Sequence, residues 1–194
     1  MAYFPAPKNG STSLRRLFFE LENGFQFREF TINGRPVDLF WLYRNQELFK
    51  PVAVPAGYEK IAVVRDPVSR FLSNYTWLVT DRNDAFPEVR EINDFVSSLE
   101  KIVQDSPKAR FHLMPQSAFL GTDLSYFDRV FKIEDTAELC RYLSERSGLK
   151  IDLPWENRSG SNAPRLSKNS MRKLGKIYEG DYALLHNFYA FQES

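Results

Sequence analysis

The 194-residue sequence has a single cysteine, no hydrophobic run long enough for a membrane span, and almost no net charge. The single cysteine, Cys140, excludes an internal disulfide and is typical of a protein from a reducing compartment. Because no run of about 18 apolar residues occurs, we expect no membrane span. The first residues do not combine a charged start with an apolar segment, so we expect no signal peptide and a cytoplasmic location.

The charged residues and the histidines limit the possible partners. Twenty-six basic residues stand against 25 acidic residues, for a formal charge of +1, which argues against a nucleic-acid-binding protein. The two histidines, His112 and His186, lie far apart in the sequence, and no spacing of potential ligands is typical of a metal site. We therefore expect neither a nucleic-acid partner nor a bound metal.

Short β-branched segments alternate with amphipathic segments along the chain. Strands are predicted at residues 2–5, 61–64 and 129–133, and residues 61–64 are typical of a buried central strand. Residues 25–32 alternate as a strand would, and residues 37–43 fit a strand or an irregular segment. Helices are predicted at residues 14–21, 67–78, 92–103, 107–120, 136–143, 168–178 and 181–191. The sequence thus predicts one domain spanning residues 1–194, with an α/β fold and a central parallel sheet.

A hydroxyl-rich loop separates the first predicted strand from the first predicted helix. Its residues are Lys8, Asn9, Gly10, Ser11, Thr12 and Ser13. Backbone N–H groups at a helix start, side-chain hydroxyls and one lysine suit a phosphate, with Ser11 or Thr12 as the N-cap of the helix. The loop is not a Walker A motif, because its lysine precedes the glycine and Pro5 stands where the first glycine belongs.

A second basic element follows the predicted central strand, in the sequence RDPVSRFLSNY (residues 65–75). Asp66 followed by Pro67 is a strong signal for a helix start. Arg65 is expected at the carboxyl edge of the sheet, where open α/β folds bind their ligands. Ser73 lies eight residues further on, within the predicted helix, so that both side chains are expected to share one anion.

These two elements resemble the nucleotide-binding motifs of sulfotransferases that use 3′-phosphoadenosine 5′-phosphosulfate (PAPS). PKNGSTSL (residues 7–14) resembles their 5′-phosphosulfate loop, and RDPVSRFLSNY resembles their 3′-phosphate-binding strand and helix. The resemblance is to the carbohydrate branch, sulfotransferase family 2, with the heparan sulfate 2-O- and chondroitin 4-O-sulfotransferases and short bacterial relatives. Three later segments are also similar to that branch: HLMPQSAFLG (112–121), FKIEDTAELCRYL (131–143) and LPWENRSGS (153–161).

The resemblance implies a three-layer fold like that of P-loop NTPases and a hydroxylated acceptor, expected to be a carbohydrate. It implies that Lys8 contacts the oxygen that bridges sulfate and 5′-phosphate, and that residues 9–13 bind the 5′-phosphate. Arg65 and Ser73 are the implied contacts of the 3′-phosphate. A loop with Asn157, Arg158 and Ser159 is expected to close over the nucleotide.

The general base stays open between two residues. The 2-O-sulfotransferase relatives have a histidine upstream of the arginine motif, whereas this sequence has none before His112. His112 is one candidate, because the unperturbed pKa of histidine suits proton abstraction near neutral pH. Asp38, in RPVDLFWLYR (residues 35–44), lies in roughly the region of the missing histidine and is the other candidate.

Two other functions fit parts of the sequence. A P-loop kinase or NTPase would use residues 61–64 and Asp66 as a Walker B strand that holds magnesium. The displaced Lys8 and the helix-starting Pro67 argue against it. A catalytically inactive nucleotide-binding relative would account for the missing upstream histidine.

Overall fold

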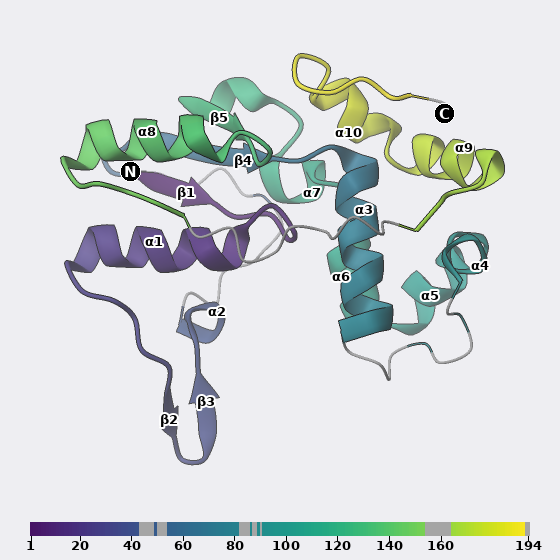
Figure 1. Ribbon diagram of the computed structural model, residues 1–194, viewed down its shortest axis with the longest axis horizontal. Helices are drawn as coiled ribbons and strands as arrows, with labels where there is room; N and C mark the ends of the chain where they lie inside the picture. The colour runs from purple at the N-terminus through teal and green to yellow at the C-terminus, as the bar shows by residue number, and fades with distance from the viewer. Residues whose placement is uncertain are drawn as a thin grey trace. The chain divides into compact units, whose positions relative to one another are not determined.

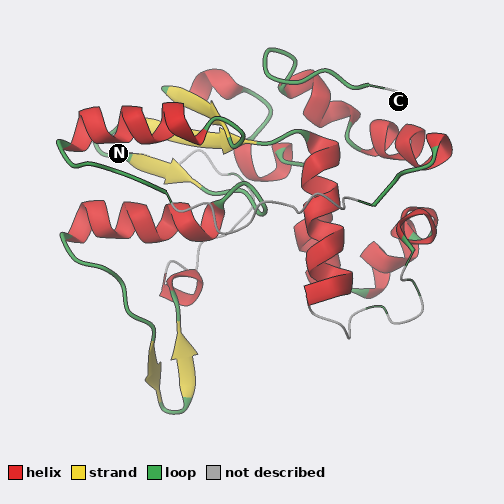
Figure 2. Cartoon of the chain, viewed as in Figure 1, coloured by secondary structure: helices red, strands yellow, loops and turns green. Residues whose placement is uncertain are grey.

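The computed structural model describes residues 1–42, 49, 54–81, 86, 89, 91–153 and 164–192. These residues contain a three-stranded sheet, a separate two-stranded sheet and a series of helices (Figures 1 and 2). The chain divides into two compact units: unit 1 comprises Met1–Val64 and Phe119–Pro154, and unit 2 comprises Arg65–Ala118 and Trp155–Ser194. That the two units form one domain over residues 1–194 stays a prediction.

The three-stranded sheet lies in unit 1 and is parallel, with the order β1–β4–β5. Its strands are β1 (Ala2–Phe4), β4 (Lys60–Val64) and β5 (Arg129–Lys132). The register pairs Tyr3 with Ile61 and Val63 with Phe131. All four residues from Ile61 to Val64 are buried, because β4 is central and covered on both faces. The predicted α/β class with a central parallel sheet is confirmed.

Two helices, α1 (Ser11–Asn23) and α8 (Thr136–Ser147), share one face of this sheet. Their common hydrophobic cluster consists of Leu14, Ile61, Val63, Phe131, Ile133, Leu139 and Leu143. Side chains alternate along a strand, so Tyr3 stacks on Phe18 of α1 while Phe4 points to the other face. There the Phe4 ring contacts Phe49, Tyr126 and Phe127.

An antiparallel hairpin of β2 (Phe30–Ile32) and β3 (Arg35–Val37) follows α1. It turns at Asn33 and Gly34, which both have positive φ, as such tight turns require. The strand predicted at residues 25–32 is therefore confined to its last three residues. A short helix, α2 (Leu39–Leu42), follows, because Asp38 Oδ1 accepts the Trp41 N–H at 2.7 Å and starts a helical turn.

Unit 2 consists of helices around a core that contains Phe71, Phe95, Leu174 and Tyr178. They are α3 (Pro67–Tyr75), which continues as a π-helix over Thr76–Asp81, α4 (Ile92–Ser97), α5 (Leu99–Asp105), α6 (Pro107–Leu113), α9 (Lys168–Ile177) and α10 (Glu179–Leu184). A further short helix, α7 (Ser117–Leu120), carries the chain into unit 1.

Two predicted helices are each interrupted. The helix predicted at 107–120 is split into α6 and α7, because Met114 precedes Pro115 and adopts an extended ψ of 147°. The helix predicted at 92–103 is split into α4 and α5 at Ser98. The last predicted helix, at 181–191, begins two residues earlier and ends at Leu184.

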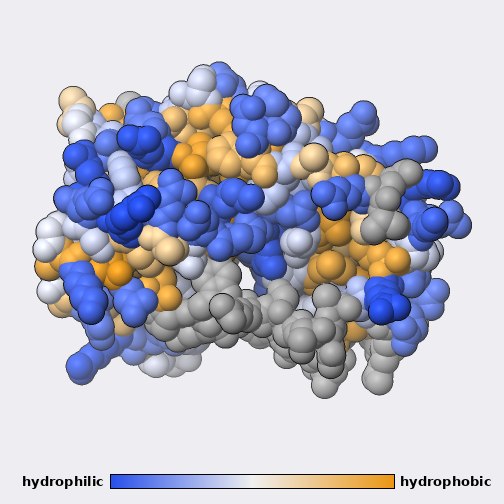
Figure 3. Space-filling view, turned by 45° about the horizontal axis from the view of Figure 1, so that its top comes forward, coloured by the Kyte–Doolittle hydropathy of each residue, from blue (hydrophilic) through white to orange (hydrophobic). Residues whose placement is uncertain are grey.

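The surface shown in Figure 3 mixes hydrophilic residues with smaller hydrophobic patches, in keeping with the mean hydropathy of −0.42. No helix among the described residues combines the length and the apolar character needed to cross a membrane.

Candidate functional site

The hydroxyl-rich loop joins β1 to α1 within unit 1, and its backbone is unusual. Lys8 has φ 66° and Gly10 has φ 71°, both in the left-handed region. For lysine this conformation is uncommon, and such residues concentrate at functional sites. The positive φ of Gly10 favours glycine, and a Cβ atom there would lie 2.8 Å from Ile133 Cδ1, so that the end of the Ile133 side chain would have to shift. The loop is thus built around one glycine and one strained lysine.

The helix that follows the loop begins without a side-chain cap. Its N-cap is Gly10, which has no side chain that could accept a hydrogen bond. The prediction of Ser11 or Thr12 as N-cap is therefore wrong. The reason is the turn at Gly10, which already places Ser11 inside the helix. The first N–H groups of this 13-residue helix therefore have no side-chain cap and lie at the positive end of its dipole. Such a helix start is suited to an anion.

Asn9 fastens the loop to the central strand. Its side chain is fully buried, and Nδ2 donates to the carbonyl of Val63 at 2.8 Å. Its backbone N–H donates to Ala6 at 3.3 Å. Val63 lies at the carboxyl end of β4, so this bond places the loop at the edge of the sheet where α/β folds bind ligands.

Unit 2 begins with Arg65, directly after β4. The buried Gln116 holds its backbone on both sides: the Arg65 N–H donates to Gln116 Oε1 at 3.0 Å, and Gln116 Nε2 donates to the Arg65 carbonyl at 2.7 Å. Asp66 is the N-cap of α3, since its Oδ1 accepts the Ser69 N–H at 2.7 Å, and Pro67 is the first helical residue, as predicted. Ser73 is half-buried and lies about 9 Å along the α3 axis from Pro67 at the usual rise per residue.

Two residues of α10 form hydrogen bonds with the segments that contain Gln116 and Asp66. The buried carboxylate of Asp181 accepts the N–H groups of Gln116 and Ser117 at 2.6 and 2.9 Å. Tyr182 donates its hydroxyl to Asp66 Oδ2 at 2.9 Å. Burial, and secondly the Asp66 carboxylate, raise the pKa of Tyr182 and keep its hydroxyl protonated as a donor.

Sequence reasoning did not identify Asp181 and Tyr182. An acidic residue at the start of a terminal amphipathic helix is normally a solvated one, so the sequence carries no signal that Asp181 is buried. Gln116 was noticed only as part of a segment similar to the sulfotransferases.

His112, one candidate base, belongs to unit 2, and its backbone is firmly held. Its carbonyl accepts from Arg70 at 3.1 Å and from Asn74 at 2.8 Å. Its ring is half-buried between the rings of Trp77 and Phe111, at centroid distances of 4.4 and 5.4 Å. The segment that contains His112 is thereby tied to the helix that carries Ser73.

Asp38, the other candidate base, belongs to unit 1 and is exposed. One of its oxygens caps α2. Its charge also acts on Arg15 of α1: burial lowers the pKa of Arg15, and Tyr3 and Asp38 oppose that shift. Asn157, Arg158 and Ser159 lie outside the described residues. Within the described part of the chain, no three His, Cys, Asp or Glu side chains are grouped as metal ligands would be.

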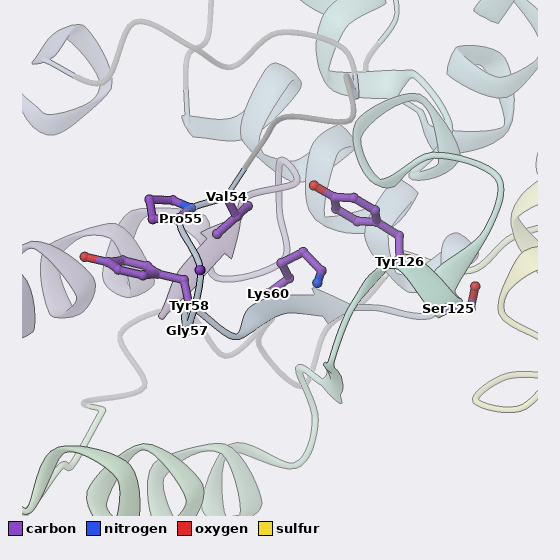
Figure 4. A pocket seen from close by; sticks show the side chains of 8 residues that line it. Val54, Pro55, Gly57, Tyr58, Lys60, Ser125 and Tyr126 are labelled. Atoms are coloured by element: carbon purple, nitrogen blue, oxygen red, sulfur yellow. The ribbon is translucent and has the colours of Figure 1, made fainter.

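A pocket of about 510 Å³ lies beside the start of β4 in unit 1 (Figure 4). Its lining residues are Val54, Pro55, Ala56, Gly57, Tyr58, Lys60, Ser125 and Tyr126. Lys60 is already paired with Asp128 at 3.1 Å, and its ammonium lies 5.5 Å from the Tyr126 ring centre. Because Lys60 begins β4 whereas Val63 holds the loop near the end of this strand, the pocket is distinct from the hydroxyl-rich loop.

Comparison with known proteins supports a family assignment. Residues 1–190 match the model of the sulfotransferase family, a match that includes both units. No match was found among curated proteins or among solved structures. Since the family match covers nearly the whole chain, the protein belongs to the sulfotransferase family.

Proposed function

We propose that this sulfotransferase uses PAPS as its donor and transfers the sulfuryl group to a hydroxyl group of a carbohydrate. The observation that carries the proposal is the uncapped start of α1, held by Asn9 at the carboxyl end of the central strand. Carbohydrate is the proposed acceptor class because the resembling motifs belong to the carbohydrate branch.

The loop residues fit the 5′ end of such a donor. Backbone N–H groups of Gly10, Ser11, Thr12 and Ser13 are suited to the 5′-phosphate, and Lys8 is suited to the oxygen between phosphate and sulfate. When bound, PAPS supplies the sulfuryl group, and negative charge develops on that bridging oxygen as the bond to sulfur breaks. A fixed lysine stabilises this charge more in the transition state than in the ground state.

We assign the 3′-phosphate to Arg65 and Ser73, and we retain residues 157–159 as the segment that closes over the nucleotide. Arg65 follows Val63 by two residues in the chain, and Val63 is the residue that holds the loop through Asn9. Arg65 and Ser73 both belong to unit 2, at the beginning and in the second turn of α3. A guanidinium and a hydroxyl are suitable donors to a phosphate.

The kinase alternative is disfavoured by the surroundings of Asp66. As a Walker B residue, Asp66 would need its carboxylate for magnesium. Instead, Oδ1 accepts the Ser69 N–H and Oδ2 accepts the Tyr182 hydroxyl. This carboxylate caps a helix, which supports a nucleotide site in which Asp66 does not hold magnesium.

The transfer reaction tests the proposal directly. Radiolabelled sulfate from PAPS is followed to a panel of glycans and small alcohols, with wild-type protein and Lys8→Ala. We expect glycan labelling by the wild type, and a loss of about 10²–10³ in kcat for Lys8→Ala with nucleotide affinity retained. Lys101→Ala, which removes an exposed lysine of α5 that is paired with Asp105 at 2.7 Å, is the matched control with unchanged turnover. Unchanged turnover in Lys8→Ala would remove Lys8 from the mechanism, and absence of transfer with intact binding would favour the inactive relative.

A second experiment identifies the general base. Asp38→Asn and His112→Ala are compared by the pH profile of kcat/KM. The variant that lacks the base is expected to lose the acidic limb of the profile together with about 10²-fold or more in rate. If both variants keep the wild-type profile, neither residue is the base.

A further inference from the structure

The backbone of Arg65 is held by a relay of buried side chains that the proposed reaction does not itself use. We infer that Gln116 and Asp181 are positioning residues, which orient Arg65 toward the 3′-phosphate of the donor and so set the preference for a 3′-phosphorylated nucleotide. This inference rests on the proposed function, because it takes Arg65 as a contact of the 3′-phosphate.

The first link of the relay is the amide of Gln116. Arg65 follows Val64, which is the last residue of β4 and pairs with Lys132 of β5. The Gln116 amide accepts from the Arg65 N–H and donates to the Arg65 carbonyl, at 3.0 and 2.7 Å, as a neighbouring strand would for one residue. With both of its peptide groups fixed, the direction in which the Arg65 side chain leaves the backbone is fixed as well.

The second link is the carboxylate of Asp181. It is fully buried and accepts the N–H groups of Gln116 and Ser117, one with each oxygen. Hydrogen bonds to a charged acceptor are short and strong, and both distances here are below 3.0 Å. The Arg70 guanidinium is the nearby positive charge that compensates this buried carboxylate, and Asp181 in turn raises the pKa of Arg70 against the lowering effect of burial.

A change in the orientation of Arg65 is expected to affect binding of the 3′-phosphate and not binding of the rest of the nucleotide. Recognition of a phosphate by a guanidinium depends on the orientation of its planar fork, so a small displacement of Arg65 weakens that contact. AMP lacks the 3′-phosphate and is held by the loop of unit 1, so its affinity does not depend on Arg65. The ratio of the Kd for AMP to the Kd for adenosine 3′,5′-bisphosphate therefore reports the position of Arg65.

The experiment measures both dissociation constants by calorimetry for the full chain. In Gln116→Met, which keeps the side-chain length but removes both hydrogen bonds, we expect the ratio to fall about tenfold, equivalent to one lost contact of about 1.4 kcal/mol. In Asp181→Asn, which keeps one carbonyl acceptor, we expect a smaller fall. The Kd for AMP is expected to stay within about twofold of wild type in both variants.

Two reference variants show whether a fall in the ratio of the two Kd values comes from Arg65 or from a general loss of stability. Arg65→Ala defines the ratio without the guanidinium. Leu174→Ala shortens a buried side chain in the core of unit 2 and destabilises this unit without removing a side-chain hydrogen bond. If Leu174→Ala lowers the ratio as much as Gln116→Met does, or if the ratio of Gln116→Met and Asp181→Asn stays at the wild-type value while that of Arg65→Ala falls, the positioning role is wrong. If Arg65→Ala itself leaves the ratio unchanged, the assignment of the 3′-phosphate to Arg65 fails, and the positioning role fails with it.

Discussion

Single residues determine the shape of the hydroxyl-rich loop. Lys8 and Gly10 both have positive φ, at 66° and 71°, and Asn9 between them is buried with its amide bonded to Val63. This conformation strains the backbone of a lysine but not that of a glycine. The strain is tolerated because the buried Asn9 holds the loop. The same three residues precede the start of α1, which has no side-chain cap.

Gly10→Ala tests how strictly the loop requires glycine. We expect a loss of about 1–2 kcal/mol from the left-handed conformation and a smaller further loss, because the end of the Ile133 side chain has to shift to admit the new Cβ. Chemical denaturation measures the free energy of unfolding, and calorimetry is expected to show weaker nucleotide binding.

Gly24→Ala is the matched control for that prediction. Gly24 has φ 76°, close to that of Gly10, but a Cβ at this position meets no atom within 4 Å. It therefore reports the conformational cost alone, with nucleotide affinity unchanged. Equal losses of stability in the two variants would mean that Ile133 does not restrict the loop.

At the scale of elements, the end of α6 is stabilised by buried side chains from α3 and from the junction of α9 and α10. Arg70 of α3 donates to Met114 and His112, and Tyr178, which follows α9, donates to the carbonyl of Leu113 at 2.9 Å. Burial raises the pKa of Tyr178 to about 12, so this hydroxyl stays a donor at physiological pH. A positive charge at a helix C-terminus is also favourable for the helix dipole.

Arg70→Met is expected to destabilise the protein strongly. Arg70 is fully buried, so its loss removes the guanidinium that donates to the partly buried Met114 carbonyl, at a cost of about 2–4 kcal/mol. Arg110→Met is the control, because Arg110 donates to the carbonyls of Val103 and Gln104 at the end of α5 in an exposed position. Water can replace these bonds, so the control should lose less than about 1 kcal/mol in urea unfolding. Comparable losses would contradict the importance of burial.

A pH-dependent contact links the start of β4 to α8. Glu59 accepts from the Tyr142 hydroxyl at 2.8 Å and from Arg146 at 2.9 Å, and these bonds lower the pKa of the Glu59 carboxyl. A lowered folded-state pKa means that the carboxylate stabilises the fold above its ordinary pKa and that this contribution disappears as the pH falls through the folded-state value.

Glu59→Gln is therefore expected to reduce stability at pH 7 and to reduce it less at pH 3, where more of the wild-type carboxylate is protonated. The loss at pH 7 should stay below about 1 kcal/mol, because the side chain is partly exposed to solvent. Denaturant unfolding at both pH values measures the difference. Glu100→Gln, at a carboxylate that is 90 % exposed and 3.6 Å from Lys173, is the control. A loss of equal size at pH 7 and pH 3 would show that the Glu59 charge is not involved.

At the scale of the whole molecule, strong local signals predicted the central strand of the sheet and the start of α3. Residues 61–64 and the pair Asp66–Pro67 are short patterns whose physical meaning does not depend on the rest of the chain, and both are confirmed. Split helices were missed because their breaks, at Ser98 and at the extended Met114, interrupt apolar periodicities that continue across them.

The candidate site was predictable only where the residues lie close together in sequence. The loop and the arginine motif are each local, whereas Asp181 reaches Gln116 across 65 residues and Gln116 reaches Arg65 across 51. The sequence spacing of these residues contains no information on such contacts. Buried polar side chains that hold other functional residues therefore have to be found in the structure.

The family match spans residues 1–190, and the proposed donor contacts are divided between the loop of unit 1 and Arg65 and Ser73 of unit 2. The most direct test of this account is a thermal-shift comparison of adenosine 3′,5′-bisphosphate with ADP plus magnesium. At about 100 times its Kd, the bisphosphate should add about 2.7 kcal/mol to the free energy of unfolding and raise the Tm, while ADP with magnesium has a much smaller effect. A rise in Tm with ADP and magnesium, together with no response to the bisphosphate, would contradict the account.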